Sequence, residues 1–143
     1  MIRTALVLAG LGLGLTAAMA DLNPVVERQQ TMKHVGAATR EGAAMAKGEA
    51  AFDAAKAQKI FKTYADAAKK MPTLFPETSK TGGETTASPK IWEDQAGFKA
   101  AFAKFEADAE AGAKATDLAD FRTAFGAATK NCGACHETYR VKR

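Results

Sequence analysis

Residues 118–139 read LADFRTAFGAATKNCGACHETY and carry the clearest pattern in the chain. Apolar and cysteine side chains recur here in unbroken steps of three and four, at Leu118, Phe121, Phe125, Ala128, Cys132, Cys135 and Tyr139. This spacing places them on one side of an α-helix, which is the stripe by which a helix packs in a bundle. The stretch therefore predicts a helix whose inner face carries both cysteines of the chain.

Within this stretch, Cys132-Gly133-Ala134-Cys135-His136 is a C-x-x-C-H run, the attachment signal of a c-type haem. Residues three and four apart share a helix face, so both thiols can reach the two vinyl groups of one porphyrin while the imidazole meets the iron. We therefore predict one covalent haem c on Cys132 and Cys135, with His136 as the proximal iron ligand.

Two readings without haem compete with this interpretation: a thiol-disulfide redox pair and a zinc site. A thioredoxin-like pair belongs to a βαβ unit, and no run of this sequence alternates as a strand does. Zinc needs four ligands, and the distant His34 does not give the usual finger spacing with the motif. A haem-free thiol or metal module remains as a rival.

The composition is typical of one helical domain. The chain has 143 residues, alanine is abundant, and its four prolines fall between long stretches. The formal net charge is +4, or +3 once Arg3 is removed with the leading segment. This mild excess does not indicate a nucleic-acid partner.

The first twenty residues differ from the rest. Arg3 leads into an apolar run at residues 5–15, and Ala18-Met19-Ala20 fits a signal-peptidase site. The apolar run is shorter than the roughly twenty residues that span a bilayer, so a membrane anchor is disfavoured. We predict that residues 1–20 are a removed signal peptide and that residues 21–143 form one domain in the periplasm, without membrane insertion.

Capping signals divide the rest of the chain into three more helices. The first runs from Asn23-Pro24 to Lys47-Gly48, and the second begins near Asp53 and ends against Pro72. The third begins at Ser88-Pro89, and Thr116 can cap the last helix. Residues 72–88, rich in proline, glycine and threonine, form the one long connection.

Each of these helices has a predicted inner face. The faces are Val25, Gln29, Met32, Gly36, Thr39, Ala43 and Ala46 on the first helix, Ala57, Phe61, Tyr64, Ala68 and Met71 on the second, and Ile91, Phe98, Phe102, Phe105, Ala109 and Gly112 on the third. With short turns on either side of the long connection, the sequence predicts an all-α fold, an antiparallel four-helix bundle with covalently bound haem.

This topology restricts the choice of a sixth iron ligand. The end of the last helix lies level with the start of the first, so Met32, Met71 and Trp92 fall near the haem. Met45 lies about 20 Å farther along the first helix. His34 is two positions from Met32 and does not share its face. A core methionine can be simple packing or an axial ligand, and position favours Met32.

Several motifs together resemble the class II cytochromes c, the group of cytochrome c′ and its low-spin relatives such as cytochrome c-556. They are Arg28-Gln29 followed by Met32, Lys47-Gly48, Ser88-Pro89-Lys90-Ile91-Trp92, the C-x-x-C-H run, and Tyr139-Arg140. In typical cytochromes c′ the position of Met32 is an apolar non-ligand, often leucine, which leaves the iron open. In the low-spin relatives a methionine there binds iron, so the resemblance implies Met32 as the distal ligand.

The resemblance covers essentially all of residues 21–143 and implies three more haem neighbours. Arg28 would lie by a propionate, Arg140 near the haem, and Trp92 against the edge of the cofactor. Each also has an ordinary reading, since an arginine is often a solvated charge over an apolar stem and a tryptophan is often core.

The predicted ligand pair indicates a function. With His136 and Met32 both bound, the iron changes oxidation state without gaining or losing a ligand, and methionine raises the reduction potential. We therefore expect a one-electron carrier, not an enzyme, that exchanges electrons with periplasmic redox proteins as a monomer or homodimer. The rival within the same family is a five-coordinate protein that binds nitric oxide or carbon monoxide.

Overall fold

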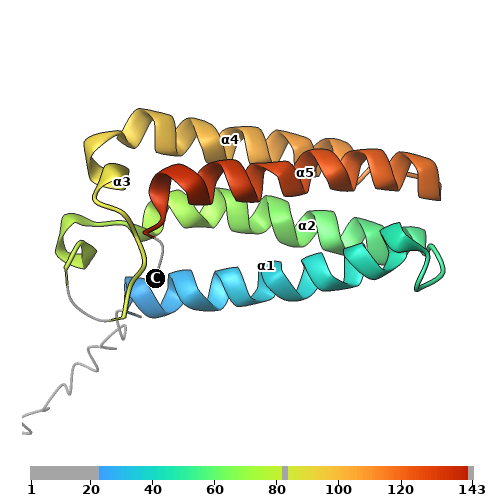
Figure 1. Cartoon of the computed structure of the whole chain (residues 1–143), viewed down its shortest axis with the longest axis horizontal. Helices are drawn as coiled ribbons and strands as arrows, with labels where there is room; N and C mark the ends of the chain where they lie inside the picture. The colour runs from blue at the N-terminus through green and yellow to red at the C-terminus, as the bar shows by residue number, and fades with distance from the viewer. Residues whose placement is uncertain (1–22, 82–83, 142–143) are drawn as a thin grey trace, which may run out of the picture.

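The computed structural model describes residues 23–81 and 84–141. The α-helices in this part are α1 (Pro24–Lys47), α2 (Ala54–Lys70), α3 (Lys90–Glu93), α4 (Gln95–Gly112) and α5 (Leu118–Tyr139), with 3₁₀ turns at Met71–Leu74 and Glu77–Ser79. The four long helices lie side by side as an antiparallel bundle (Figure 1), which confirms the predicted fold class. The predicted signal peptide, residues 1–20, lies outside the described residues.

Both ends of α1 follow the capping signals of the sequence. The Asn23 side chain accepts a hydrogen bond from the Val25 N–H at 2.9 Å, and α1 stops at Gly48, whose φ is 81°. A left-handed residue of this kind favours glycine. The start of α5 differs from expectation: Asp117, not Thr116, is the cap, because its carboxylate accepts from the Asp120 N–H at 2.9 Å.

The third predicted helix is two helices. Asp94 separates α3 from α4 with non-helical backbone (φ −130°, ψ 60°), and its carboxylate accepts from the Gly97 N–H at 3.0 Å. The prediction of one continuous helix was wrong at this point. An aspartate can bond backbone N–H groups outside a helix, and here it caps a new helix instead of continuing the old one.

The core of the bundle is aromatic. All five predicted inner residues of α2 are buried, and Phe61 and Tyr64 are completely inaccessible. The two rings meet edge-on at a centroid distance of 6.1 Å, Phe61 meets Phe121 at 5.7 Å, and Tyr64 meets Phe105 at 5.4 Å. Such geometry is favoured by aromatic quadrupoles and fixes how the helices fit together.

The predicted inner face of α1 was right at Val25 but wrong by about one position along the rest of the helix. Its buried residues are Val25, Arg28, Val35, Ala38, Gly42 and Met45. Met32, Gly36 and Thr39 are half-buried and border a cavity beside α5 instead. Helix α1 has two neighbouring apolar stripes, and periodicity alone does not say which one packs against protein.

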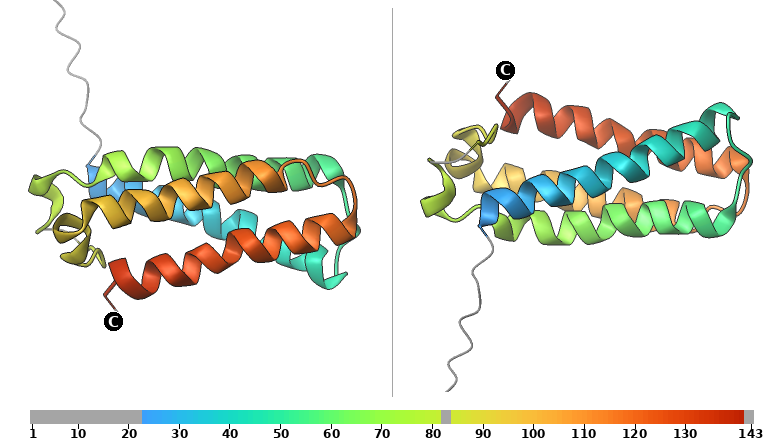
Figure 2. Two further views of the ribbon diagram at one scale, coloured as in Figure 1. Left: turned by 90° about the horizontal axis from the view of Figure 1, so that it is seen from above. Right: turned by 90° about the horizontal axis from the view of Figure 1, so that it is seen from below.

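Helices α1 and α5 meet at one end of the bundle and diverge toward the other (Figure 2). Where they meet, Arg122 Nε donates to the Ala46 carbonyl at 2.7 Å, and Gly42 leaves room for the Phe125 ring. Where they diverge, the C-x-x-C-H residues of α5 face the first half of α1. No helix in the described ranges is long and apolar enough to cross a membrane.

Candidate cofactor site

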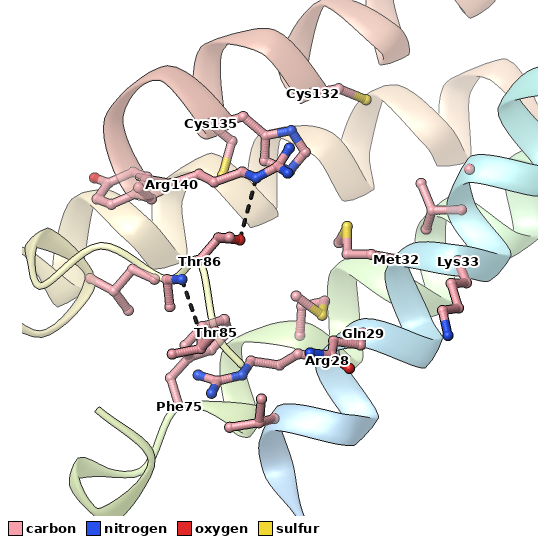
Figure 3. A pocket seen from close by; sticks show the side chains of 18 of the residues that line it. Arg28, Gln29, Met32, Lys33, Phe75, Thr85, Thr86, Cys132, Cys135 and Arg140 are labelled. Atoms are coloured by element: carbon pink, nitrogen blue, oxygen red, sulfur yellow. Dashed lines mark hydrogen bonds between the residues drawn. The ribbon is translucent and has the colours of Figure 1, made fainter. Parts of the chain in front are cut away.

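A cavity of about 790 Å³ lies between α1, the end of α5 and the connection from α2 to α3 (Figure 3). This volume is typical of small-molecule and cofactor sites. Six of the seven predicted site residues line it: Arg28, Met32, Cys132, Cys135, His136 and Arg140. Its apolar walls include Val25, Val35, Met71, Ile91, Phe98 and Phe102.

The wall formed by α5 carries the two thiols and the imidazole. Cys132 and Cys135 are free and half-buried, and burial raises the pKa of both thiols. Reactive redox cysteines need a lowered pKa, so this environment does not favour a thiol-disulfide catalyst. Among the described residues, no cluster of three or more histidines, cysteines and carboxylates could hold a metal ion.

The surroundings of His136 favour the neutral imidazole that iron ligation needs. Partial burial lowers the pKa of its imidazole, and the positive charge of Arg140 lowers it further. A neutral imidazole offers a ring nitrogen to a metal, whereas the protonated form does not.

The opposite wall belongs to α1 and carries Met32. Its side chain extends from α1 into the cavity (Figure 3), and it also lines an adjoining pocket of about 60 Å³ together with His136. Met71 lines the larger cavity as well, while Met45 and the exposed His34 line neither. Both Met32 and Met71 therefore lie at the cavity, and ligation of the iron by Met32 stays a prediction.

Arg28 is a buried cation on the cavity wall. Its side chain is 6% exposed, and Nη2 donates to the Ser79 carbonyl at 3.3 Å. Its Nη1 is buried and has no hydrogen-bond partner in the described part of the chain. Burial lowers the pKa of the guanidinium. A buried charged donor without a partner is costly, and an anionic group in the cavity would satisfy it.

A short strap of residues 84–88 crosses the mouth of the cavity and is tied to both walls. Gln29 Nε2 donates to the Glu84 carbonyl at 2.6 Å on the α1 side. On the α5 side, Arg140 Nε donates to Thr86 Oγ1 at 3.4 Å (Figure 3), and the Val141 N–H donates to the Thr86 carbonyl at 2.9 Å. The strap thus fixes Arg140 at the rim.

Trp92 does not line this cavity. Its indole Nε1 donates to the Phe75 carbonyl at 3.1 Å, and its ring meets the Phe75 ring edge-on at 6.0 Å. Phe75 itself lines the cavity. Phe75 lies in an irregular, proline-flanked segment without periodicity, so no sequence pattern predicts it as a cavity residue. The contact of Trp92 with the cofactor stays a prediction.

The sequence comparisons agree with this geometry. A family model described as cytochrome c′ matches residues 23–140. This chain belongs to the cytochrome c′ family. It is 46% identical over 135 residues to a cytochrome c′ of Rhodopseudomonas palustris, with 93% of this chain and 90% of that protein covered. It is 40% identical over 121 residues to a cytochrome c-556 of Agrobacterium fabrum, with 83% and 82% covered.

Solved structures show the same fold. A cytochrome c′ from Rhodopseudomonas palustris has a TM-score of 0.81 and 45% identity, and the match covers 85% of this chain and 98% of the chain in that structure. A nitric oxide complex of a cytochrome c prime variant from Alcaligenes xylosoxidans has a TM-score of 0.73 and 30% identity, with 83% and 94% covered. The resemblance drawn from the sequence motifs is confirmed.

Membership of the family establishes the cofactor. Proteins of the cytochrome c′ family bind one covalently attached haem c, and this chain is a haem protein. The cavity fits such a group, since it brings together the two cysteines of the chain, an imidazole whose pKa is lowered, and a buried guanidinium whose Nη1 has no partner among the described residues. The covalent haem predicted from C-x-x-C-H is thereby confirmed as the class of cofactor.

Proposed function

We propose that this protein is a one-electron carrier whose haem c is attached through Cys132 and Cys135, with His136 and Met32 as the axial iron ligands. One observation carries the proposal: Met32 on α1 and His136 on α5 line the same cavity from opposite walls. A thioether and a neutral imidazole are the donor pair of electron-transfer cytochromes.

The haem supplies the redox-active iron, and the residues of the chain set its surroundings. His136 and Met32 both come from long helices whose far ends are joined by the contact between Arg122 and Ala46. Such rigid supports keep a ligand pair in place when the charge changes. The apolar walls limit water near the metal, which favours the less charged, reduced state.

The charged residues of the cavity have roles toward the propionate groups in this proposal. Arg28 binds a propionate through Nη1, which satisfies its buried donor. Arg140, held at the rim by Thr86, keeps a positive charge near His136. Trp92 supports the cofactor edge through Phe75, behind which it packs.

We also propose that the protein works in the periplasm with other redox proteins. This rests on the signal-peptide pattern of residues 1–20 and on the mature domain predicted for residues 21–143. N-terminal sequencing of protein exported from a bacterial host tests it, and Asp21 is the expected first residue.

Absorption and magnetic spectra of the matured protein test the ligand pair. The wild-type protein should be low-spin in both oxidation states, and Met32→Leu should convert it to a high-spin form because leucine offers no donor. Met45→Leu is the matched control, since Met45 is buried at 1% exposure away from the cavity. A high-spin wild-type spectrum that Met32→Leu leaves unchanged would contradict the proposal.

The second candidate is a five-coordinate binder of nitric oxide or carbon monoxide. It is favoured by the solved nitric oxide complex of a relative and by the small apolar pocket beside Met32. Carbon monoxide binding to the reduced protein separates the two. A carrier with bound Met32 should bind the gas slowly, and Met32→Leu should speed binding at least tenfold, whereas an open iron site should bind equally fast in both proteins.

A further inference from the structure

The segment between α2 and α3 holds the buried cation of the cavity in place. The guanidinium carbon of Arg28 lies 4.4 Å from the centroid of the Phe75 ring, which allows a cation–π contact. The Ser79 carbonyl accepts from Nη2 at 3.3 Å. Both contacts come from residues 75–79, in the segment that follows α2, so two parts of the chain far apart in sequence define one side-chain position.

The Phe75 ring is itself firmly held. It meets the Phe98 ring edge-on at 4.8 Å and the Trp92 ring at 6.0 Å, and its backbone carbonyl accepts from Trp92 Nε1. Phe98 is buried on α4, so the ring is fixed against the bundle. It offers a rigid face on which a guanidinium can lie.

An arginine near a helix start would ordinarily extend into water and keep its charge solvated. Arg28 is buried instead. The neighbouring Glu27 does not pair with it, because the Glu27 carboxylate forms an ion pair with Lys70 at 2.9 Å. No carboxylate in the described ranges forms an ion pair with Arg28. The contacts with Phe75 and Ser79 therefore hold a desolvated cation at the cavity wall.

We propose that Phe75 is a positioning residue of the haem site: its ring and the Ser79 carbonyl hold Arg28 so that Nη1 faces the cavity and binds a haem propionate. The inference rests on the proposed role of Arg28 and is independent of ligation by Met32. A positive charge held near the haem disfavours the more positive ferric state, so it raises the reduction potential. Releasing Arg28 to solvent should lower that potential.

The experiment measures the reduction potential of the haem-loaded protein in five variants. Phe75→Leu and Arg28→Gln should each lower it, and the double variant should show no further fall beyond Arg28→Gln. Phe75→Tyr keeps an aromatic face and should stay close to wild type. Phe52→Leu is the matched control, because Phe52 is also half-buried and packs on a ring, Phe121, at 5.9 Å, but does not line the cavity.

The proposal would be overturned if Phe75→Leu lowered the potential by the same amount in the wild-type protein and in the Arg28→Gln variant. The ring would then act through packing alone. An unchanged potential in Phe75→Leu would overturn it too. If that variant does not take up haem, nuclear magnetic resonance of the reduced wild-type protein under carbon monoxide decides, since low-spin ferrous haem is diamagnetic. The Arg28 side-chain signals should show ring-current shifts and contacts to a propionate, and solvent-like signals would refute the role.

These readouts separate the inference from the ligand pair. A high-spin wild-type spectrum would refute Met32 as an iron ligand. The differences in reduction potential among the Phe75 and Arg28 variants would still test the positioning role of Phe75. Conversely, a low-spin spectrum with no linked effect of Phe75 and Arg28 would end the inference alone.

Discussion

The hydroxyl group of Tyr139 donates a hydrogen bond to Asp94 Oδ2 over 2.9 Å, which joins the end of α5 to the first turn of α4. Gly97 makes room for this bond: a Cβ there would lie 2.6 Å from the Tyr139 hydroxyl oxygen and would also strike the Asp94 carboxylate. The bond anchors the helix that carries the haem just after His136.

This relationship predicts coupled effects of Gly97→Ala and Tyr139→Phe on stability. Each single variant should lower the urea midpoint of unfolding, and Gly97→Ala should lower it more because the new methyl group displaces two partners. In the Tyr139→Phe background the effect of Gly97→Ala should shrink, since one of the two clashes is gone. Strict additivity of the two effects would show that the hydroxyl group does not need the glycine.

The same carboxylate predicts sensitivity to acid. The Gly97 N–H, and to a smaller degree the Tyr139 hydroxyl, hold the pKa of Asp94 below its usual value of 3.8. A carboxylate with a lowered folded-state pKa stabilises the fold fully above its unfolded value, and this contribution is lost as pH falls through the folded value. Asp94→Asn should therefore cost stability at about pH 7 and cost much less near pH 2. The urea midpoints of both proteins at the two pH values measure this, and a constant difference would contradict it.

Much of the fold could be predicted because most helices have one apolar stripe. In α2 and α5 the spacing of large side chains leaves a single possible inner face. The capping residues Asn23 and Asp53 mark the starts of α1 and α2 directly. In α1 small side chains form two adjacent stripes, so the choice between them depends on which helices it meets. The break at Asp94 comes with a local cap on the Gly97 N–H, but the bond of this aspartate to Tyr139, 45 positions away, is contained in no local pattern.

The candidate site could be predicted where its residues form a short motif of fixed spacing or where the topology sets their position along the bundle. Cys132, Cys135 and His136 form a local motif, and Met32 follows from the level at which antiparallel helices meet. The burial of Arg28 could not be inferred from periodicity, because it depends on Phe75 and Ser79 in an irregular segment. Residues of this kind are placed by tertiary contacts and leave no repeat in the sequence.

A hydroxyl pair at the cavity wall, formed by the half-buried Thr39 and the buried Tyr64, predicts a defined loss of stability in Tyr64→Phe. Thr39 Oγ1 uses its one proton on the Val35 carbonyl at 2.8 Å, so the Tyr64 hydroxyl is the donor in its 2.9 Å bond to Thr39. Burial is the main cause that raises the pKa of Tyr64 to about 12, so the phenol stays protonated near neutrality. Tyr64→Phe, which removes the hydroxyl group, should lower the free energy of unfolding by about 1 kcal/mol.

Urea unfolding of haem-loaded protein measures this loss. Thr39→Val removes the acceptor and should cost a similar amount, and the double variant should cost less than the two losses added together. The absorption spectrum should stay unchanged, because neither hydroxyl group is proposed to bind iron. A spectrum shifted by Tyr64→Phe alone would assign this pair to the iron surroundings instead.

Two helical glycines predict opposite outcomes of the same substitution. Gly112, at the end of α4, lies against the fully buried Phe61 ring, and a methyl group there would overlap it. Gly126 is exposed on α5, and a methyl group there would meet no heavy atom within 4 Å apart from its chain neighbours and the nearby backbone of its own helix. Gly112→Ala should therefore destabilise the fold by about 1–3 kcal/mol through overpacking, whereas Gly126→Ala should stabilise it by up to about 1 kcal/mol through lower backbone entropy in the unfolded chain. Urea midpoints measure both, and a stabilising Gly112→Ala would mean that the Phe61 ring can move, and with it the aromatic core beside Tyr64.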